Sequence, residues 1–253
     1  MNLPPLFGRE FPSYERECYD NRVDVLWYQP AFSQSQYPPG QEGSEACTLI
    51  CLLVAQGISQ NEIILWDVDD YWDLSVVIAQ AIAEGNRTHA WIMRQGLVAY
   101  AYLNTEEALK YGGSSLKLLR EWTFHVYHED IRERLFQNIQ FHLRIWYEQP
   151  KSENLFMLLI ASGRTILFTF QEKTFKVTLF DSHTHNASGL PPRGLVVAQT
   201  SFDHLRSLCE WYMRHVLTNC YKICPAQYEL AFVYHVESNG HRYQTSQCSC
   251  QRF

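Results

Sequence analysis

Residues 40–57 of the chain read GQEGSEACTLICLLVAQG, and the first helical pattern of the sequence begins inside this stretch. Residues recurring at the spacing of one helix face are Cys47, Ile50, Cys51, Val54 and Ala55. Ser44 suits the start of such a helix because its hydroxyl can cap free backbone N–H groups, and Gly57 suits its end. The stretch therefore predicts a helix that starts after Ser44 and carries Cys47 in its first turn.

Helical patterns continue through the first part of the chain. One or two helices are expected over residues 60–84, and one each over 105–110 and 129–146. Gly85 and Asn86 are expected to end the first of these segments, and Asn104 is suited to cap the helix over 105–110. Residues 1–40 are rich in Pro, Gln, Ser and Tyr, so we expect an irregular lead-in there.

The second part of the chain changes to strand patterns. Strands are expected over residues 155–161, 165–170, 175–180, 194–199 and 228–236, with one helix over 202–217. The first three strands are separated by short turns and predict an antiparallel meander. Segregated rather than alternating helices and strands are typical of the α+β class. We expect one domain over residues 41–236, followed by a polar tail over 237–253.

The composition limits the possible function classes. With 253 residues, of which 46% are hydrophobic, the chain is long enough for one sizeable core. A net charge of −6 argues against a surface that tracks phosphates, so no nucleic acid is expected as a partner. The aromatic content of 14 Phe, 15 Tyr and 7 Trp favours a surface that binds another protein.

The sequence predicts neither a signal peptide nor a membrane-spanning segment. The sequence start has no charged segment followed by an apolar run, and no stretch approaches the roughly 20 apolar residues that span a membrane. We therefore expect no membrane partner and a cytoplasmic or nuclear location, where the eight cysteines are reduced. Cys220-x-x-x-Cys224 and Cys248-x-Cys250 differ from the Cys-x-x-Cys spacing more common in structural zinc sites. We expect unpaired thiols, no metal and no cofactor.

Cys47 has the features of a nucleophilic thiol. A free thiol is only a few per cent ionised at neutral pH, and a helix N-terminus lowers its pKa. Small residues before it, Gly43, Ser44 and Ala46, leave room for a substrate backbone. Cys51 lies one turn further on the same face and is interpreted as a core thiol. Ordinary burial in the core is the alternative interpretation of Cys47 itself.

The partners that a thiolate needs lie in two other segments. Asp181 and His183 share a face at the end of a predicted strand, so Asp181 can orient the His183 ring toward the sulfur. His185 follows in a predicted loop, so His183 is the preferred base. Gln41, six residues before Cys47, can direct its amide at a developing oxyanion. The alternatives are a turn capped by Asp181 and an ordinary loop amide at Gln41.

Two short motifs resemble known cysteine proteases. Residues 40–48 are similar to the nucleophile segment of papain-like cysteine proteases, and Phe-Asp-Ser-His at 180–183 resembles the Asp-x-His signature of the herpesvirus tegument deubiquitinases. The resemblance implies a papain-like fold in which Cys47 is the nucleophile and His183 the base. It also implies that Asp181 orients the base and that Gln41 lies in the oxyanion hole. In the tegument family the Gln lies further upstream of the Cys than it does here.

The function implied by the resemblance is that of a cysteine isopeptidase or protease acting on ubiquitin or a ubiquitin-like modifier. Two alternatives use the same site. A papain-like pseudoenzyme would bind a partner protein without turnover, and a transglutaminase-like enzyme would transfer the acyl group to an amine. Labelling by a ubiquitin-based probe separates the isopeptidase from the pseudoenzyme, and amine incorporation identifies the transglutaminase-like enzyme.

Overall fold

The computed structural model describes residues 12–67 and 72–236. One sheet runs through it, with the strand order β1-β2-β7-β6-β5-β4-β8-β3 and every neighbouring pair antiparallel. The strands are β1 Tyr14–Tyr19, β2 Val23–Tyr28, β3 Leu119–Tyr127, β4 Asn154–Ala161, β5 Arg164–Gln171, β6 Lys176–Asp181, β7 Val196–Ser201 and β8 Tyr228–His235.

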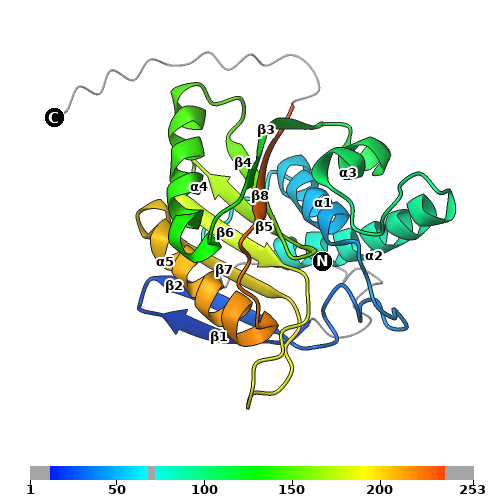
Figure 1. Cartoon of the computed structure of the whole chain (residues 1–253), viewed down its shortest axis with the longest axis horizontal. Coiled ribbons are helices and arrows are strands. Elements are labelled where there is room, and N and C mark those ends of the chain that lie inside the picture. The colour runs from blue at the N-terminus through cyan, green and yellow to red at the C-terminus, as the bar shows by residue number, and fades with distance from the viewer. Residues whose placement is uncertain (1–11, 68–71, 237–253) are drawn as a thin grey trace.

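Helices cover both faces of this sheet (Figure 1). On one side lie α1 Cys47–Gln60, α2 Trp72–Arg94 and α3 Thr105–Tyr111. On the other side lie α4 Ile131–Glu148, α5 Leu205–Trp211 and the π-helical segment Tyr212–Tyr221 that continues α5. Among the described residues, no helix is both long and apolar enough to cross a membrane.

Each face of the sheet has its own hydrophobic core. In β4, Phe156 and Leu158 belong to the core under α1 and α2, whereas Leu155, Met157 and Leu159 belong to the core under α4 and α5. Because successive side chains of a strand point to opposite faces, a strand buried on both faces is apolar at every position. This arrangement explains the continuous apolar run that marked β4 in the sequence.

The predicted α+β class is confirmed, and so is the meander. The expected strands 155–161, 165–170 and 175–180 correspond to β4, β5 and β6, which pair in that order. The cap of α3 is also as expected. The Asn104 side chain accepts a hydrogen bond from Glu107 N–H at 2.8 Å, and the Glu107 carboxylate accepts one from Asn104 N–H at 3.1 Å.

The predicted irregular lead-in over residues 1–40 is wrong for residues 14–28. There β1 and β2 form a hairpin, and β2 also pairs with β7, so this segment belongs to the sheet. In the turn between them, Asp20 has φ 51° and Asn21 has φ 53°. Two successive residues in the left-handed region are typical of a type I′ hairpin turn, for which Asn and Asp are favoured. The predicted polar tail over 237–253 lies outside the described residues.

The start of α1 differs from the prediction in its cap. The cap residue is Ala46, so Cys47 is the first residue of the helix. The Ser44 hydroxyl is used in the preceding loop, where it accepts from Ala46 N–H at 3.2 Å and donates to the Asn86 side chain at 2.6 Å. The prediction that Cys47 lies in the first turn is nevertheless confirmed.

Two glycines interpreted as helix ends lie inside helices. A Cβ on Gly57 of α1 would lie 2.5 Å from Val77, and a Cβ on Gly85 of α2 would lie 2.6 Å from Ile50. Both distances are far below van der Waals contact, so each glycine allows α1 and α2 to approach closely. Tertiary packing, rather than helix termination, therefore explains these glycines.

Two further elements differ from the sequence-based expectations. Residues 119–127, for which no strand was predicted, form β3 at the edge of the sheet beside β8. The helix expected over 202–217 begins as a 3₁₀ turn, continues as α5 and ends as the π-helical segment at Tyr221. That extension brings Tyr221 to the end of β6, where the predicted site residues lie.

Candidate active site

Cys47 is nearly buried at the start of α1, with 3% of its surface exposed. Burial raises the pKa of its thiol, but a hydrogen bond and the charge of His183 lower it, as do hydrogen bonds from Thr165. The lowering effects together exceed the effect of burial, so the pKa of Cys47 lies below its ordinary value. This environment favours the thiolate, which is the nucleophilic form of cysteine.

His183 has the opposite shift. Burial lowers the pKa of its imidazole, but the charge and hydrogen bond of Asp181 and the interaction with Cys47 raise it to about 9. The His183 Nδ1 atom lies 2.6 Å from Asp181 Oδ1, which leaves the other ring nitrogen for the sulfur. A lowered pKa of the thiol beside a raised pKa of the imidazole favours transfer of the thiol proton to the ring.

Asp181 is the last residue of β6 and is fully buried. Its Oδ1 atom accepts from both the ring and the backbone N–H of His183, the latter at 3.1 Å. Burial raises the pKa of the Asp181 carboxyl, but the charges of His183 and His185 and their hydrogen bonds hold it well below its ordinary range. The two interpretations of Asp181 therefore coincide, because one carboxylate caps the turn and orients the His183 ring.

Sequence reasoning missed the second set of contacts at Asp181. The Oδ2 atom lies 2.8 Å from the Tyr221 hydroxyl and 3.3 Å from His185 Nε2. His185, which was expected in a loop, is 1% exposed and forms a bridge of two backbone hydrogen bonds with Arg193. The Asp-x-His-x-His spacing was visible in the sequence, but Tyr221 lies forty residues later and carried no signal.

Thr165, near the start of β5, is a further residue that the sequence did not single out. Its hydroxyl and backbone interact with the Cys47 sulfur and lower the pKa of that thiol. The Thr165 hydroxyl also lies 2.8 Å from that of Thr48, which in turn donates to Leu103 O at 2.8 Å. The first turn of α1 is thereby attached to β5, which fixes the sulfur relative to the sheet.

Gln34 joins the two segments that carry the site. Its side-chain oxygen accepts from the Ser182 hydroxyl at 2.6 Å, and its amide nitrogen donates to Ser44 O at 3.0 Å. Its backbone N–H donates to Ser182 O at 2.8 Å. This 1% exposed residue thus connects the loop before Cys47 to the residue between Asp181 and His183, and sequence reasoning missed it.

Gln41, the predicted oxyanion residue, is partly exposed in the loop before α1. Its amide donates to Gly43 O at 2.6 Å, so it lies against its own loop. Gly43 has φ 72°, and a Cβ there would meet nothing within 4 Å, so the chain before Cys47 borders open space. Gln41 has a second amide hydrogen beyond the one used by Gly43, and that hydrogen can serve a ligand.

Cys51 has the surroundings of a core thiol, as expected. It is completely buried, and its thiol donates to Thr165 O at 3.5 Å. Burial and the neighbouring Cys47 and Asp181 raise the pKa of Cys51 well above its ordinary value. Cys51 therefore stays a neutral thiol, and the ionisable sulfur of this region is that of Cys47.

Among the described residues, no group of three or more His, Cys, Asp or Glu side chains is arranged to hold a metal ion. Cys220 and Cys224 are free thiols, whereas Cys248 and Cys250 lie outside the described residues.

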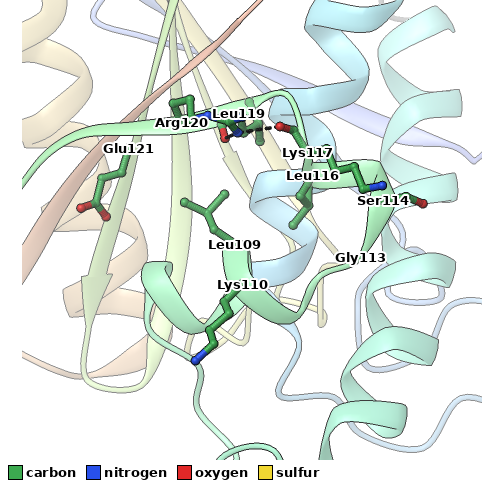
Figure 2. A pocket seen from close by; sticks show the side chains of 9 residues that line it. All are labelled: Leu109, Lys110, Gly113, Ser114, Leu116, Lys117, Leu119, Arg120 and Glu121. Atoms are coloured by element: carbon green, nitrogen blue, oxygen red, sulfur yellow. Dashed lines mark hydrogen bonds between the residues drawn. The ribbon is translucent and has the colours of Figure 1, made fainter.

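A pocket of about 660 Å³ lies between α3 and the start of β3 (Figure 2). Arg120 is one of the lining residues and donates to Lys117 O at 2.5 Å and Leu119 O at 2.8 Å. Residues 109–121 supply its lining, and none of the residues around Cys47 contributes to it. This pocket is therefore separate from the Cys47 site.

No protein-family model matches the chain, and no curated protein matches it by sequence. Its structure is similar to that of the ubiquitin-specific protease encoded by murine cytomegalovirus tegument protein M48, solved with a ubiquitin-based suicide substrate. That similarity has a TM-score of 0.49 and 14% sequence identity, and covers 84% of this chain and 87% of that chain. The Pseudomonas avirulence protein AvrPphB is similar with a TM-score of 0.43 and 11% identity, over 76% of this chain and 95% of that chain. Both similarities have TM-scores below 0.5, and the first is to a herpesvirus tegument protease.

Proposed function

We propose that the chain is a cysteine hydrolase whose nucleophile is Cys47 and whose base is His183. One observation carries this proposal: the Cys47 thiol has a lowered pKa while the hydrogen-bonded His183 imidazole has its pKa raised to about 9. Pairs of titratable groups whose surroundings move their pKa values in opposite directions are typical of catalytic sites. A core thiol has the reverse pattern, as Cys51 illustrates.

The first half of the reaction forms an acyl-enzyme. The Cys47 thiolate attacks the scissile carbonyl carbon, and the C=O electron pair moves onto the oxygen. The Cys47 N–H has no partner within α1 because it belongs to the first turn, so it can donate to this oxyanion together with the Gln41 amide. His183 then gives its proton to the leaving amine as the C–N bond breaks.

The second half restores the enzyme. His183, now neutral, takes a proton from water, and the hydroxide attacks the thioester carbonyl. The C–S bond breaks, the acid product leaves, and the proton on His183 pairs again with the Cys47 thiolate. Asp181 keeps the same ring nitrogen of His183 occupied throughout, because the 2.6 Å contact fixes the tautomer.

For the substrate we propose the carboxyl-terminal tail of ubiquitin or of a ubiquitin-like protein, joined to an amine. This choice is supported by the resemblance of residues 180–183 to the signature of the tegument deubiquitinases. Gly43, Ser44 and Ala46 before Cys47 are small, and Gly43 borders open space, which suits an extended tail of small residues.

A ubiquitin-based vinyl probe is expected to form a thioether with Cys47 in the full chain. The physical reason is that only the Cys47 thiol of this region has a lowered pKa, so only this sulfur reacts rapidly at neutral pH. The adduct is detected as a gel shift and located by peptide mass spectrometry. Cys47→Ala is the active-site control, and Cys51→Ala is the matched thiol control. Labelling of Cys51 in place of Cys47, or no labelling at all, would contradict the proposal.

Gln41→Ala is expected to lower kcat by about a hundredfold and to change KM little, because an oxyanion donor acts mainly in the transition state. Gln34→Ala is the comparison variant, since Gln34 is also a glutamine upstream of Cys47 and its amide donates to Ser44 O. Steady-state kinetics give kcat and KM for each variant. Circular dichroism is used to compare equal amounts of folded protein. If Gln41→Ala retains the parent kcat, the assignment of Gln41 as the oxyanion donor fails.

A protein-binding module without turnover is the second candidate function. It is favoured by the 3% exposure of Cys47 and by exposed aromatic side chains on and after α2, namely Trp91, Tyr100 and Tyr102. This candidate predicts that Cys47→Ala binds a ubiquitin-like partner as tightly as the parent and that the parent releases no product. Transglutaminase-like transfer uses the same acyl-enzyme and is identified by incorporation of a fluorescent amine into the acyl product.

A further inference from the structure

Asp181 has two carboxylate oxygens, and the reaction proposed above uses only one of them. Oδ1 holds His183, whereas Oδ2 faces the Tyr221 hydroxyl at 2.8 Å and His185 Nε2 at 3.3 Å. The carboxylate is fully buried, so water does not satisfy an unpaired oxygen there. Whatever fixes Oδ2 therefore also fixes the direction in which Oδ1 points.

His185 is held from several sides. Its Nδ1 atom lies 2.6 Å from Gly194 O, and because a carbonyl only accepts, Nδ1 carries a hydrogen and donates it. The edge of the Trp27 ring lies against the imidazole with ring centroids 5.1 Å apart. The backbone of His185 is paired with Arg193. The ring is thus locked with Nε2 next to Asp181.

Tyr221 approaches the same oxygen from the end of the π-helical segment. A carboxylate only accepts, so the Tyr221 hydroxyl donates to Asp181 Oδ2. The same hydroxyl lies 3.0 Å from His185 Nε2, and the two rings stack with centroids 5.4 Å apart. The Arg164 guanidinium lies 4.3 Å from the centre of the Tyr221 ring. These contacts leave the phenol little freedom to turn away from the carboxylate.

We propose that Tyr221 is a positioning residue whose hydroxyl holds Oδ2 of Asp181, and that His185 keeps the Tyr221 ring in place by stacking on it, so that Oδ1 stays on His183 and the imidazole stays directed at Cys47. The inference deepens the proposed function, on which it rests for the identity of the reacting sulfur. The terminal torsion of an aspartate is broad, so a carboxylate with one unpaired oxygen turns to find another donor. Occupation of Oδ2 removes that freedom, and the 2.6 Å contact to His183 is kept.

The direction of the expected effect follows from the groups that face Asp181. The titratable or charged side chains that interact with its carboxylate are His183, His185, Tyr212, Tyr221, Cys51 and Cys220, and Arg164 faces the two tyrosines. Of these groups, His183 is the one whose hydrogen bond and charge lower the pKa of Cys47. An Asp181 carboxylate that can turn away from His183 stabilises the protonated His183 ring less. The Cys47 thiolate is then stabilised less by the charge of that ring.

The test is the rate of Cys47 alkylation by iodoacetamide as a function of pH, followed in the full chain by peptide mass spectrometry. Tyr221→Phe removes only the hydroxyl, and it is expected to move the midpoint of the Cys47 profile to higher pH by about one unit. Where a substrate is turned over, kcat falls by about ten- to a hundredfold and KM stays within about twofold. His185→Gln is expected to change both quantities in the same direction.

Tyr228→Phe is the matched control. Tyr228 is a buried tyrosine whose hydroxyl lies near Asn138 at 2.7 Å and Glu129 at 3.2 Å. Loss of that hydroxyl is expected to leave the Cys47 profile unchanged. A second control is Tyr221→Phe in the Asp181→Asn background, where no further shift is expected because Tyr221 acts through the carboxylate.

Two results would overturn the inference: a Cys47 profile unchanged by Tyr221→Phe, or a shift of the same size in the Asp181→Asn background. Alkylation needs no substrate, so its outcome is independent of whether ubiquitin is cleaved. A shifted profile in a chain that fails to react with ubiquitin supports the positioning role and contradicts the substrate assignment alone.

Discussion

His183→Ala is expected to lower kcat/KM by about 10⁴-fold and to return Cys47 to the neutral thiol at pH 7. Burial of Cys47 is the largest single influence on its pKa and acts upward, and the hydrogen bond and charge of His183 are the main influences that oppose it. Without the imidazole the effect of burial remains, so the pKa of Cys47 rises. The variant loses both the base and most of the thiolate.

Two measurements separate these losses. Hydrolysis of a fluorogenic substrate reports the whole reaction, and iodoacetamide alkylation at pH 7 reports the thiolate alone. His128→Ala is the matched control, because His128 is an exposed histidine on the loop between β3 and α4. If His183→Ala alkylates at the parent rate, the thiolate is not supported by His183 and the catalytic pair is wrongly assigned.

Asp181→Asn is expected to lower kcat by about 10³-fold and to move the alkaline limb of the pH–rate profile to lower pH. The direction of this change follows from the groups that set the pKa of His183. Burial lowers the pKa of the imidazole, and the charge of Asp181 is the main influence that raises it to about 9. An asparagine keeps the shape but removes the charge, so the imidazolium loses its proton at a lower pH than in the parent.

The pH–rate profile of kcat/KM between about pH 5 and 10 measures this limb. In the parent, the rate is expected to fall as pH rises through about 9, where His183 loses its proton. Asp203→Asn is the control, because Asp203 is an exposed aspartate near the start of α5. An alkaline limb that stays near pH 9 in Asp181→Asn would mean that Asp181 does not set the state of His183.

The sequence around Cys47 predicted much of α1, because the helical pattern depends only on residues within that segment. A helix face follows from residue spacing, and Cys47 falls in the first turn whichever neighbour provides the cap. The cap itself was mispredicted, since Ser44 bonds to Asn86 of α2, a contact across the fold. Gly57 and Gly85 were mispredicted for the same reason, because only the packed helices show that α1 and α2 meet there.

The hairpin at residues 14–28 was missed although it carries a local signal. Asp20 and Asn21 are a favoured pair for a type I′ turn, but the surrounding Pro, Gln and Ser suggested a loop. β1 is exposed along most of its length, so it lacks the apolar alternation that marks a strand. The pairing of β2 with β7 stabilises the hairpin, and a partner so far along the chain leaves no local pattern.

The sequence by itself determined the α+β class, the meander of β4 to β6, and three residues of the candidate site, Cys47, Asp181 and His183. Each depends on short-range patterns: apolar runs, a helix start, and two residues on one face of a strand end. The tertiary structure alone decided which groups surround them. Thr165, Gln34 and Tyr221 reach the site from β5, the loop before α1 and the π-helical segment. Their contacts join residues distant in the chain, and burial then makes each unpaired donor or acceptor costly, so the packed fold specifies them.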